Sequence, residues 1–436
     1  MSLILATDAA GHASAARALE SADVVVIGAG PAGSAAAAHL AAAGLDVLVL
    51  ERTSGTTRSG TAALTPRAVA ELRALGLGEA DTATWHATTG VRFVGGGMRL
   101  ALAWPDAARR PGLGLACAQS TLDDTLLSYA VARGARVRRA TEVTGLTTDA
   151  QGRATGVTAH DLDGAHHRTG TGLTVRASVV LDASGVAAGQ PSGVAVSADF
   201  ESPRHEDDHL ESWLSLSGAD GTSLPGHGWI LGRGDGHVTV GVGALAADTT
   251  ATADRCAGVL EQWLTALPTD WQLSEGTRTA PVVGTRLATV PTHRAATNGA
   301  VLRIGDAAGA AHPVTGEGLT GALVSARVAA TVVTEALVHE GAAEREGALT
   351  AYASRLDEAL GHHDRVGRVA ARLLDRPTVA RLATTYALPR EALMKHVLRH
   401  VTPTGTPVET CVTHPTMVSV TRAAAHPGTE RGVEQR

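Results

Sequence analysis

The chain is poor in aromatic residues, cysteine and lysine. Only 3% of its 436 residues are aromatic, so a stacking surface in any binding site must be built from few side chains. The cysteines, Cys117, Cys256 and Cys411, are far apart and form no C-x-x-C pair. We therefore expect a reduced, cytoplasmic protein rather than a disulfide scaffold. Lys395 is the only lysine, so arginine carries almost all of the positive charge.

A strong net charge and long apolar runs are also missing. The net charge of −6 offers no basic surface, so we expect no nucleic-acid partner. No apolar run approaches the roughly 20 residues of a membrane span, and the N-terminus lacks the basic region of a signal peptide. The run His362-His363-Asp364 has metal-like composition, but a solvated helix face explains it better, and we expect no metal. With 44% apolar residues, a chain of this length predicts a globular enzyme of two lobes.

The first fifty residues contain a β-α-β pattern. Residues 24–27 form a continuous apolar run of the buried parallel-strand kind. A helix over 32–43 follows, Gly44 stands where helices end, and 47–50 reads as the next buried strand. The pattern predicts the start of a dinucleotide-binding fold.

The turn between the first strand and the helix carries the glycine spacing G-x-G-x-x-G. Gly28 permits the tight turn, Gly30 leaves room for a pyrophosphate, and Gly33 lets the helix pack closely on the strand. Glu51, 23 residues after Gly28, can accept hydrogen bonds from both ribose hydroxyls, which disfavours a 2′-phosphate here. The expected binding residues of this segment also include Pro31, Ala32 and Arg52.

A second glycine-rich segment follows the predicted strand 301–304. Asp306 at the end of this strand can accept hydrogen bonds from a ribityl chain, and the loop Pro313–Gly318 can bring bare backbone close to a flavin ring. We expect the helix that starts near Gly318 to direct its positive end at the negative charge of reduced flavin. The expected binding residues here are Gly305, Asp306, Pro313, Gly316, Gly318 and Leu319.

Three motifs together resemble one known family. The segments Gly28–Glu51, Leu181–Gly185 and Gly305–Leu319 are similar in order and spacing to the p-hydroxybenzoate hydroxylase/geranylgeranyl reductase superfamily of FAD-dependent oxidoreductases. The resemblance covers roughly three-quarters of the chain. It implies an α/β fold: a glutathione-reductase-type FAD-binding Rossmann-like domain, an antiparallel-sheet substrate domain that roofs the flavin, and a C-terminal helical region.

We expect the chain to divide into five parts. Residues 1–20 form an N-terminal extension, 21–190 and 291–340 form the FAD-binding domain, 191–290 form the substrate sheet, and 341–436 form the C-terminal helical region and tail. Within these parts the pattern predicts a helix over 120–133 capped by Ser120, and strands over 212–217, 228–231 and 237–242.

The sequence leaves the branch of the superfamily open. Arg58 and Gln119 match the pattern of aromatic-hydroxylase-type monooxygenases, in which a glutamine lies near the flavin. The segments Thr315–Leu319 and Gly228–Val242 look more like reductases and halogenases. Ser59 stands where some of those reductases carry cysteine. Halogenation is disfavoured because the single lysine is C-terminal and no W-x-W-x-x-P motif is present.

Our leading interpretation is an FAD-dependent monooxygenase that uses NAD(P)H and O₂ to hydroxylate or epoxidise a mainly apolar small molecule. A geranylgeranyl-reductase-like enzyme that saturates an isoprenoid double bond is the alternative. A flavin-binding protein without turnover is a third reading, from a different class. No second dinucleotide fingerprint is visible, so a separate flavin reductase is a conceivable partner, as is a second copy of the chain.

Individual side chains keep two readings each. Arg58 could hold the pyrophosphate or a mobile flavin, or be a solvated loop arginine; Gln119 could lie beside the ring or only begin a helix. His312 could act as acid or base, although a structural hydrogen bond is the more common role of a histidine. Trp213 and Trp229 could line the substrate pocket or pack in the core.

Overall fold

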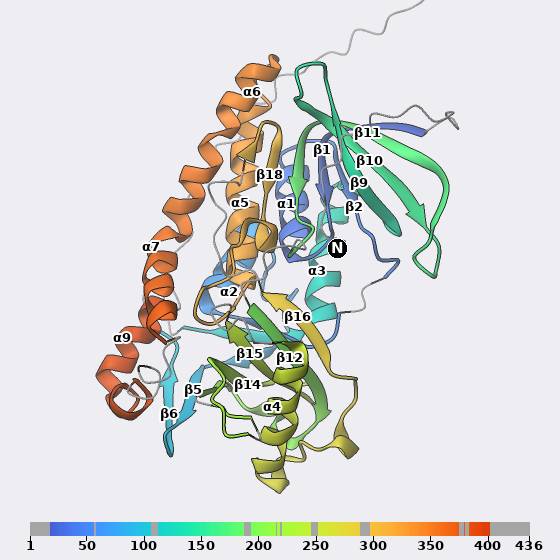
Figure 1. The fold of residues 1–436 in the computed structure, drawn as a ribbon. Helices are drawn as coiled ribbons and strands as arrows, with labels where there is room; N and C mark the ends of the chain where they lie inside the picture. Colours follow the sequence, from blue (N-terminus) through green and yellow to red (C-terminus); the bar gives the residue numbers. More distant parts are fainter. Residues whose placement is uncertain are drawn as a thin grey trace, which may run out of the picture.

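The computed structural model describes most of the chain as a mixed α/β fold with two large sheets, one above the other in Figure 1. The described residues are 18–55, 58–105, 112–186, 193–214, 216–218, 220–245, 252–287, 297–374, 379 and 383–401. The expectations for residues 1–17, for the tail from 402 onward and for Cys411 lie outside them, as do the side chains of His362, His363 and Asp364.

The upper sheet has eight strands around a parallel centre. Strand β1 lies between β2 and β11, so both of its edges are paired, and Val24, Val25 and Val26 are fully buried. The apolar run predicted a strand of this kind, and β1 extends further toward the N-terminus than expected. In sheet order the strands are β17 (Thr297–Asn298), β18 (Val301–Arg303), β11 (Arg168–Asp182), β1 (Ala18–Ile27), β2 (Val47–Leu50) and β8 (Arg136–Arg138), with β10 (Ala154–Leu162) on β11 and β9 (Thr141–Thr148) on β10.

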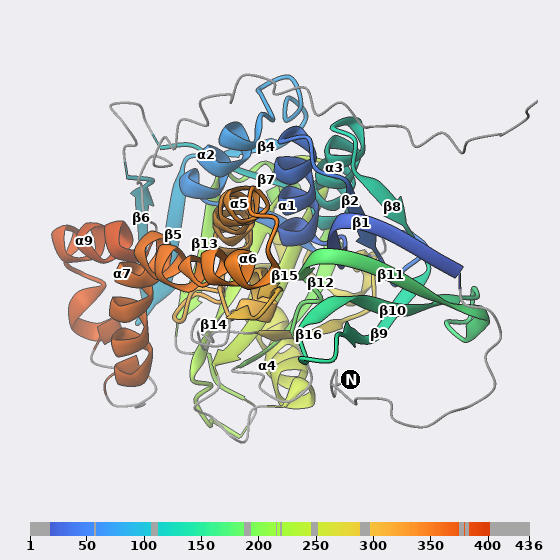
Figure 2. The same ribbon diagram turned by 90° about the horizontal axis from the view of Figure 1, so that it is seen from above.

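Two apolar layers cover this sheet, one on each face. Helices pack on one face, and the meander β9–β10 folds over the other, as Figure 2 shows from above. Alanine dominates α1, which allows α1 to lie close to both α3 and α5. The helices of this layer are α1 (Pro31–Ala42), α2 (Pro66–Leu75), α3 (Gln119–Ala132), α5 (Leu319–Ala336), α6 (Ala342–Leu349) and α7 (Ala351–Leu374).

Helix α5 is the one helix of the described residues whose length and mean hydropathy would suit a membrane span. In the fold, 72% of it is buried inside the protein, where it packs against α1, α2, α6 and α7. Its apolar character is accounted for by this central position, because a helix enclosed by neighbours is apolar on most sides.

The lower sheet has seven strands and is covered on its far face by helix α4 (Ala253–Ala266), which buries Cys256, Leu260 and Trp263 against it. This helix was not predicted within the strand-rich region. The strands, in sheet order, are β16 (Val283–Leu287), β12 (Gly193–Glu201), β15 (His237–Leu245), β14 (Gly226–Gly232), β13 (His209–Leu214), β5 (Gly90–Gly95) and β6 (Met98–Ala103).

Strands β5 and β6 depart from the expected division of the chain. Residues 90–103 fall within the stretch 21–190 that was expected to belong to the FAD-binding domain, yet β5 pairs in parallel with β13 from His209↔Gly90 to Trp213↔Val94. The lower sheet therefore draws strands from two distant parts of the sequence. A third, small sheet connects the two regions and consists of β3 (Thr61–Leu64), β7 (Gly114–Ala118) and β4 (His86–Thr88).

Two further details concern helices. The predicted cap at Ser120 is wrong, because α3 begins at Gln119 with Ala118 before it and no side-chain cap. The backbone N–H of Gln119 instead donates to the carbonyl of Gly60, the residue before β3, at 2.9 Å. This bond satisfies the first N–H group of the helix. Near the C-terminus, α9 (Glu391–Val401) buries Met394 and Leu398 against β5 and β6.

Candidate functional site

A cavity of about 2180 Å³ lies between the two sheets. It exceeds the roughly 300–1,000 Å³ typical of a small-ligand pocket, so it has room for a large cofactor and a second molecule. Its walls come from the glycine turn after β1, the segment after β18, the cavity-side face of the lower sheet and helix α9.

The glycine turn places the N-terminus of helix α1 at the cavity wall. Gly28 has a φ of 97°, and a Cβ there would meet the carbonyl oxygen of Ala183 at 2.7 Å. A Cβ at Gly33 would meet the carbonyl of Gly28 at 2.0 Å, so helix and turn are in direct contact. Gly30 precedes α1 without any side-chain cap and lines the cavity with Pro31 and Ala32. The first-turn N–H groups and the positive end of the helix dipole are thus available to an anion.

Glu51 is held beside this turn by three hydrogen bonds. Its carboxylate accepts from the N–H of Ala29 at 2.7 Å and from both the N–H and the hydroxyl of Thr53 at 2.7 Å. Glu51 and Arg52 both line the cavity. A carboxylate fixed at this point, next to a phosphate-binding turn, suits the hydroxyls of a ribose.

The segment after β18 meets the glycine turn directly. Gly305 has a φ of 60°, and a Cβ on it would lie 2.7 Å from the Cβ of Ala32 in α1. Asp306 follows on the 3₁₀ helix Gly305–Ala308 and lines the cavity. Its carboxylate has no hydrogen-bond partner among the described residues; burial raises its pKa, and the Arg58 guanidinium acts in the opposite direction. Such a group is suited to accept hydrogen bonds from a ligand's hydroxyls.

The loop that follows divides its residues between the cavity and the core. Gly316, Gly318 and Leu319 line the cavity, whereas Pro313 and His312 are not among the described lining residues. The Nδ1 atom of His312 accepts from the N–H groups of Val314 and Thr315 at 3.3 Å, and a Cβ at Gly367 of α7 would lie 3.2 Å from its Nε2 atom. His312 therefore shapes the loop from the α7 side, which disfavours its proposed acid–base role.

Glu317 is a cavity residue that the sequence reading did not single out. Its Oε1 atom accepts from the N–H of Thr320 at 2.8 Å, so its carboxyl group occupies part of the first turn of α5. Burial raises its pKa, and the N–H and hydroxyl of Thr320 partly offset that effect. One N–H group at this helix end is therefore already paired with Glu317, which the expected interaction of this helix end with a reduced flavin did not include. The signal was visible as an acid two residues before the helix.

Arg58 and Gln119 meet at a second acid that was missed, Asp123. Gln119 Nε2 donates to Asp123 Oδ1 at 2.9 Å, and Arg58 NH1 lies 3.6 Å from Asp123 Oδ2. All three line the cavity, although the Arg58 side chain is 57% exposed. Burial raises the pKa of Asp123, and Arg58 lowers it again. The spacing of four residues between Gln119 and Asp123, on one helix face, was the available signal.

The two candidate tryptophans separate. Trp229 of β14 lines the cavity and lies over the neighbouring strand, where a Cβ at Gly241 would meet the indole at 2.2 Å. Trp213 of β13 instead packs on the far side of the sheet, its ring centre 5.3 Å from that of Trp263 in α4. Trp213 therefore packs against the core under α4, and Trp229 lines the cavity, where substrate contact stays a prediction.

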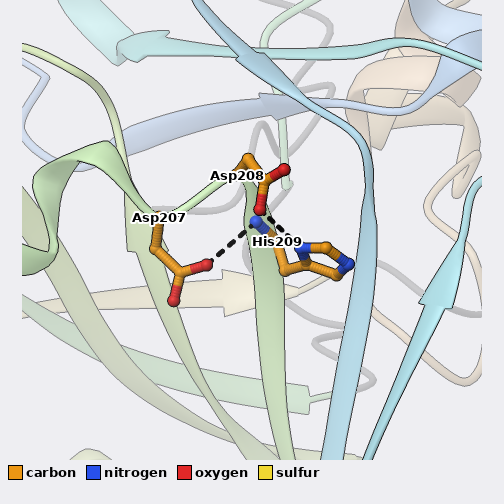
Figure 3. Close-up of side chains that lie close together, drawn as sticks. All are labelled: Asp207, Asp208 and His209. Carbon is orange, nitrogen blue, oxygen red and sulfur yellow. Dashed lines mark hydrogen bonds and ion pairs between the residues drawn. The ribbon is translucent and has the colours of Figure 1, made fainter.

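A cluster of two acids and a histidine at the start of β13 has the composition of a metal site, and Figure 3 shows how its members lie. His209 Nδ1 is 2.6 Å from Asp208 Oδ1, and Asp207 accepts from the backbone N–H of His209 at 3.1 Å. Asp207 also holds Arg92 at 2.7 Å and is bonded to Arg204. Hydrogen bonds from these two arginines satisfy the Asp207 carboxylate. Burial alone would raise its pKa, but the hydrogen bonds from Arg92 and Arg204 outweigh burial and lower it to about 2. We assign this cluster a structural role.

Comparison with known proteins agrees with this geometry. The FAD binding domain family matches residues 21–241, about half of the chain. The menaquinone reductase of Mycolicibacterium smegmatis is 34% identical over 389 residues, which are 85% of this chain and 85% of that protein.

The chain belongs to the p-hydroxybenzoate hydroxylase/geranylgeranyl reductase superfamily of FAD-dependent oxidoreductases.

Two more distant comparisons extend the likeness. Digeranylgeranylglycerophospholipid reductase 2 of Methanopyrus kandleri is 29% identical over 399 residues, 86% of this chain and 92% of that protein. A geranylgeranyl bacteriochlorophyll reductase-like structure from Thermoplasma acidophilum has a TM-score of 0.69 at 20% identity and covers 88% of this chain and 98% of that one. The last likeness concerns the fold alone.

The described residues fit FAD as the cofactor of this flavoenzyme. The uncapped start of α1 suits its pyrophosphate, Glu51 its ribose, and the unpartnered carboxylate of Asp306 its ribityl chain. A Cβ at Gly318 would lie 3.2 Å from Asp306 Oδ1, so the absence of a side chain there leaves this carboxylate open to a ligand.

Proposed function

We propose that this flavoenzyme is a reductase that saturates a carbon–carbon double bond in a long, isoprenoid-type substrate. The observation that carries the proposal is the apolar wall that continues from the flavin segments across the lower sheet to α9. Bound reduced FAD would supply a hydride to one carbon of the double bond and become oxidised, and a proton would be added to the other carbon. The protein would hold an extended apolar chain against the ring and exclude water. Six members of the wall are Val91, Phe93, Leu210, Leu214, Met394 and Leu398.

The reductive direction is supported by the relatives. A relative 34% identical over 85% of the chain is named a menaquinone reductase, and another is named for the reduction of a digeranylgeranyl lipid. Both names denote reduction, and both denote molecules with long apolar parts. The cavity could bury such a chain, because its lower wall is mostly apolar.

A monooxygenase is the second candidate, favoured by Arg58 and Gln119. Both match the hydroxylase pattern and both line the cavity. In either case we propose NAD(P)H as the reductant. We also propose residues 21–190 and 291–340 as the FAD-binding region, without the β5–β6 hairpin, and 191–290 with that hairpin as the substrate sheet.

Turnover with and without oxygen separates these functions. The holoenzyme would be reduced chemically under anaerobic conditions and given a short isoprenoid alkene, with a parallel reaction under ¹⁸O₂. We expect a product that has gained two hydrogen atoms and no oxygen, formed equally well in both reactions. A product that needs O₂ and carries ¹⁸O would instead establish the monooxygenase. Slow, substrate-independent oxidation of the flavin with no product at all would support a flavin-binding protein without turnover.

A further inference from the structure

The cavity wall contains a polar side chain that neither the FAD segments nor the apolar wall accounts for. On β14, residues alternate between the two faces of the sheet: His227, Trp229 and Leu231 line the cavity, whereas Ile230 is buried under α4. His227 is paired with Leu214 on one side and with Gly243 on the other. Its imidazole therefore projects from the sheet into a largely apolar region.

His227 has no hydrogen-bond partner within the described part of the chain. Its one ring contact there is the tilted indole of Trp229, with ring centres 5.8 Å apart. Burial alone lowers the pKa of His227 to about 4, and no charged group contributes to the change. The ring is consequently neutral at physiological pH and carries one N–H donor and one acceptor nitrogen. The ring is only partly buried because it faces the cavity, so a ligand that fills the cavity would withdraw it from water. A ligand group that hydrogen-bonds the ring then gains affinity over one that leaves it unpaired.

The position of His227 indicates which part of a substrate it would meet. Leu231 lies opposite Thr239, whose hydroxyl is 2.7 Å from that of Thr61 in the small sheet beside Gly60. His227 is four residues further along the same strand, roughly 13 Å away at the usual rise per residue. It therefore lies beyond Trp229, at a distance from the Thr61 contact that a long substrate could span.

We propose that His227 is a specificity-determining residue that hydrogen-bonds an uncharged polar head, such as a quinone carbonyl oxygen, attached to the apolar chain of the substrate. The inference rests on the proposed function for the identity of the apolar chain. A neutral imidazole N–H is a good donor to a carbonyl. It is a poor partner for a phosphate, which favours cationic donors in a bidentate geometry. The substrate class is then a prenylated quinone rather than a phospholipid.

Equilibrium titration of the oxidised holoenzyme tests this without any turnover. Three probes would be compared: a naphthoquinone with a short isoprenoid chain, the matched isoprenoid hydrocarbon, and the matched isoprenoid phosphate. His227→Phe keeps the size of the ring and removes the donor. We expect it to raise the Kd of the quinone about tenfold, the worth of one hydrogen bond, and to leave the Kd of the hydrocarbon within about twofold. His227→Gln, which retains an N–H donor, should recover part of the affinity.

Leu231→Ala is the matched control, because it lies on the same face of the same strand and has no polar atom. It should weaken quinone and hydrocarbon alike. The proposal is overturned if His227→Phe weakens both probes equally, if it affects neither, or if the phosphate is the probe that depends on His227. FAD content of each variant would be measured to confirm folding. An oxygenated product in turnover would remove the reductase function but leave this binding result unchanged, so the two failures are distinguishable.

Discussion

Asp306 is a residue whose side chain lacks a hydrogen-bond partner in the protein without cofactor and would gain one when FAD binds. Its carboxylate is partly buried, has no hydrogen-bond partner among the described residues, and has a pKa raised by desolvation. Gly30 contributes space rather than a hydrogen bond. The nearest atom to a Cβ added there is Arg58 NH1 at 3.6 Å, an ordinary contact distance. An alanine there would fit the protein and collide only with a ligand.

The first prediction concerns FAD retention. Gly30→Ala should lose most of its FAD because the methyl group occupies space near the pyrophosphate. Asp306→Asn should weaken FAD binding tenfold or more, since a hydrogen bond to a charged group contributes roughly 1.5–3 kcal/mol. The flavin-to-protein ratio after gel filtration measures both. Gly258→Ala in α4, where an added Cβ meets nothing within 4 Å, is the control and should remain fully yellow. Wild-type occupancy in both site variants would show that the binding site is misassigned.

A second prediction concerns pH and the same carboxylate. Because burial holds the pKa of Asp306 above its value in the unfolded chain, ionisation costs folding stability at a pH above the folded-state pKa. That cost disappears as the pH falls below the unfolded value. Apo-protein with Asp306→Asn should therefore be more stable than wild-type apo-protein at neutral pH, and the difference should shrink as the pH is lowered. Urea unfolding at several pH values measures it; a difference that grows on acidification would contradict the assignment.

Among elements, α2 and α5 are joined by a buried group of charges. Glu71 of α2 accepts from Arg67 at 3.0 Å and from Arg327 of α5 at 2.7 Å, and its side chain is 1% exposed. His39 of α1 is nearby, and its pKa falls to about 4, mainly through burial. The ion pair between Glu71 and Arg327 therefore joins α2 to α5 within the helix layer.

The third prediction is that Glu71→Gln destabilises the holoenzyme by about 3–5 kcal/mol, because two arginines lose their buried counter-charge. Chemical denaturation of wild type and variant gives the difference. The exposed pair Lys395–Glu391 on α9 is the control, and Glu391→Gln should cost no more than about 0.5 kcal/mol. A loss below about 1 kcal/mol in Glu71→Gln would mean that the interior is more hydrated than its burial suggests.

Local signals predicted the elements that are fixed by local chemistry. The strands 24–27 and 47–50, the helix between them and the turn at Gly28 follow from apolar runs and glycines, and all are present. Helix α4 had its own signal, a Thr252 cap and apolar residues at helical spacing, but lay within strand-like text. The pairing of β5 with β13 could not be predicted, because the local sequence of a strand does not indicate which distant strand it pairs with.

The same division applies to the candidate site. The glycines, Glu51 and Asp306 were predicted because each follows a strand at a spacing that backbone geometry requires. Asp123, Glu317 and His227 were missed because their role depends on which face of a helix or sheet meets the cavity. For His312 the sequence left two roles open, because its ring lies against α7, a helix whose contacts the sequence does not reveal.

At the scale of the whole molecule, FAD would link segments that are distant in sequence. The turn after β1 and the segment after β18 meet at Ala32 and Gly305, and both border the cavity. A ligand that binds both segments only when they are assembled must stabilise the folded state by mass action.

The fourth prediction follows from this linkage. Apo-protein given FAD at about 100 times its Kd should gain roughly 2.7 kcal/mol in unfolding free energy, seen as a rise in the thermal midpoint. Riboflavin, which lacks the ADP half, should give a much smaller rise at the same concentration. Equal rises with both compounds would mean that the glycine turn and Glu51 contribute nothing to binding.

The long strand β11 has a consequence for how the protein is made. β1 pairs with one edge of it over Leu173–Asp182. On the other edge β10 pairs with the first half, and β18, which begins only at Val301, pairs with Val180–Asp182. While the ribosome is still producing the lower sheet, the last three residues of β11 have no strand beside them on the edge that faces away from β1. Open edges of this kind recruit other chains. The segment that covers these three residues is followed directly by Asp306, so closing this edge of the sheet and completing the candidate flavin site depend on the same late part of the chain.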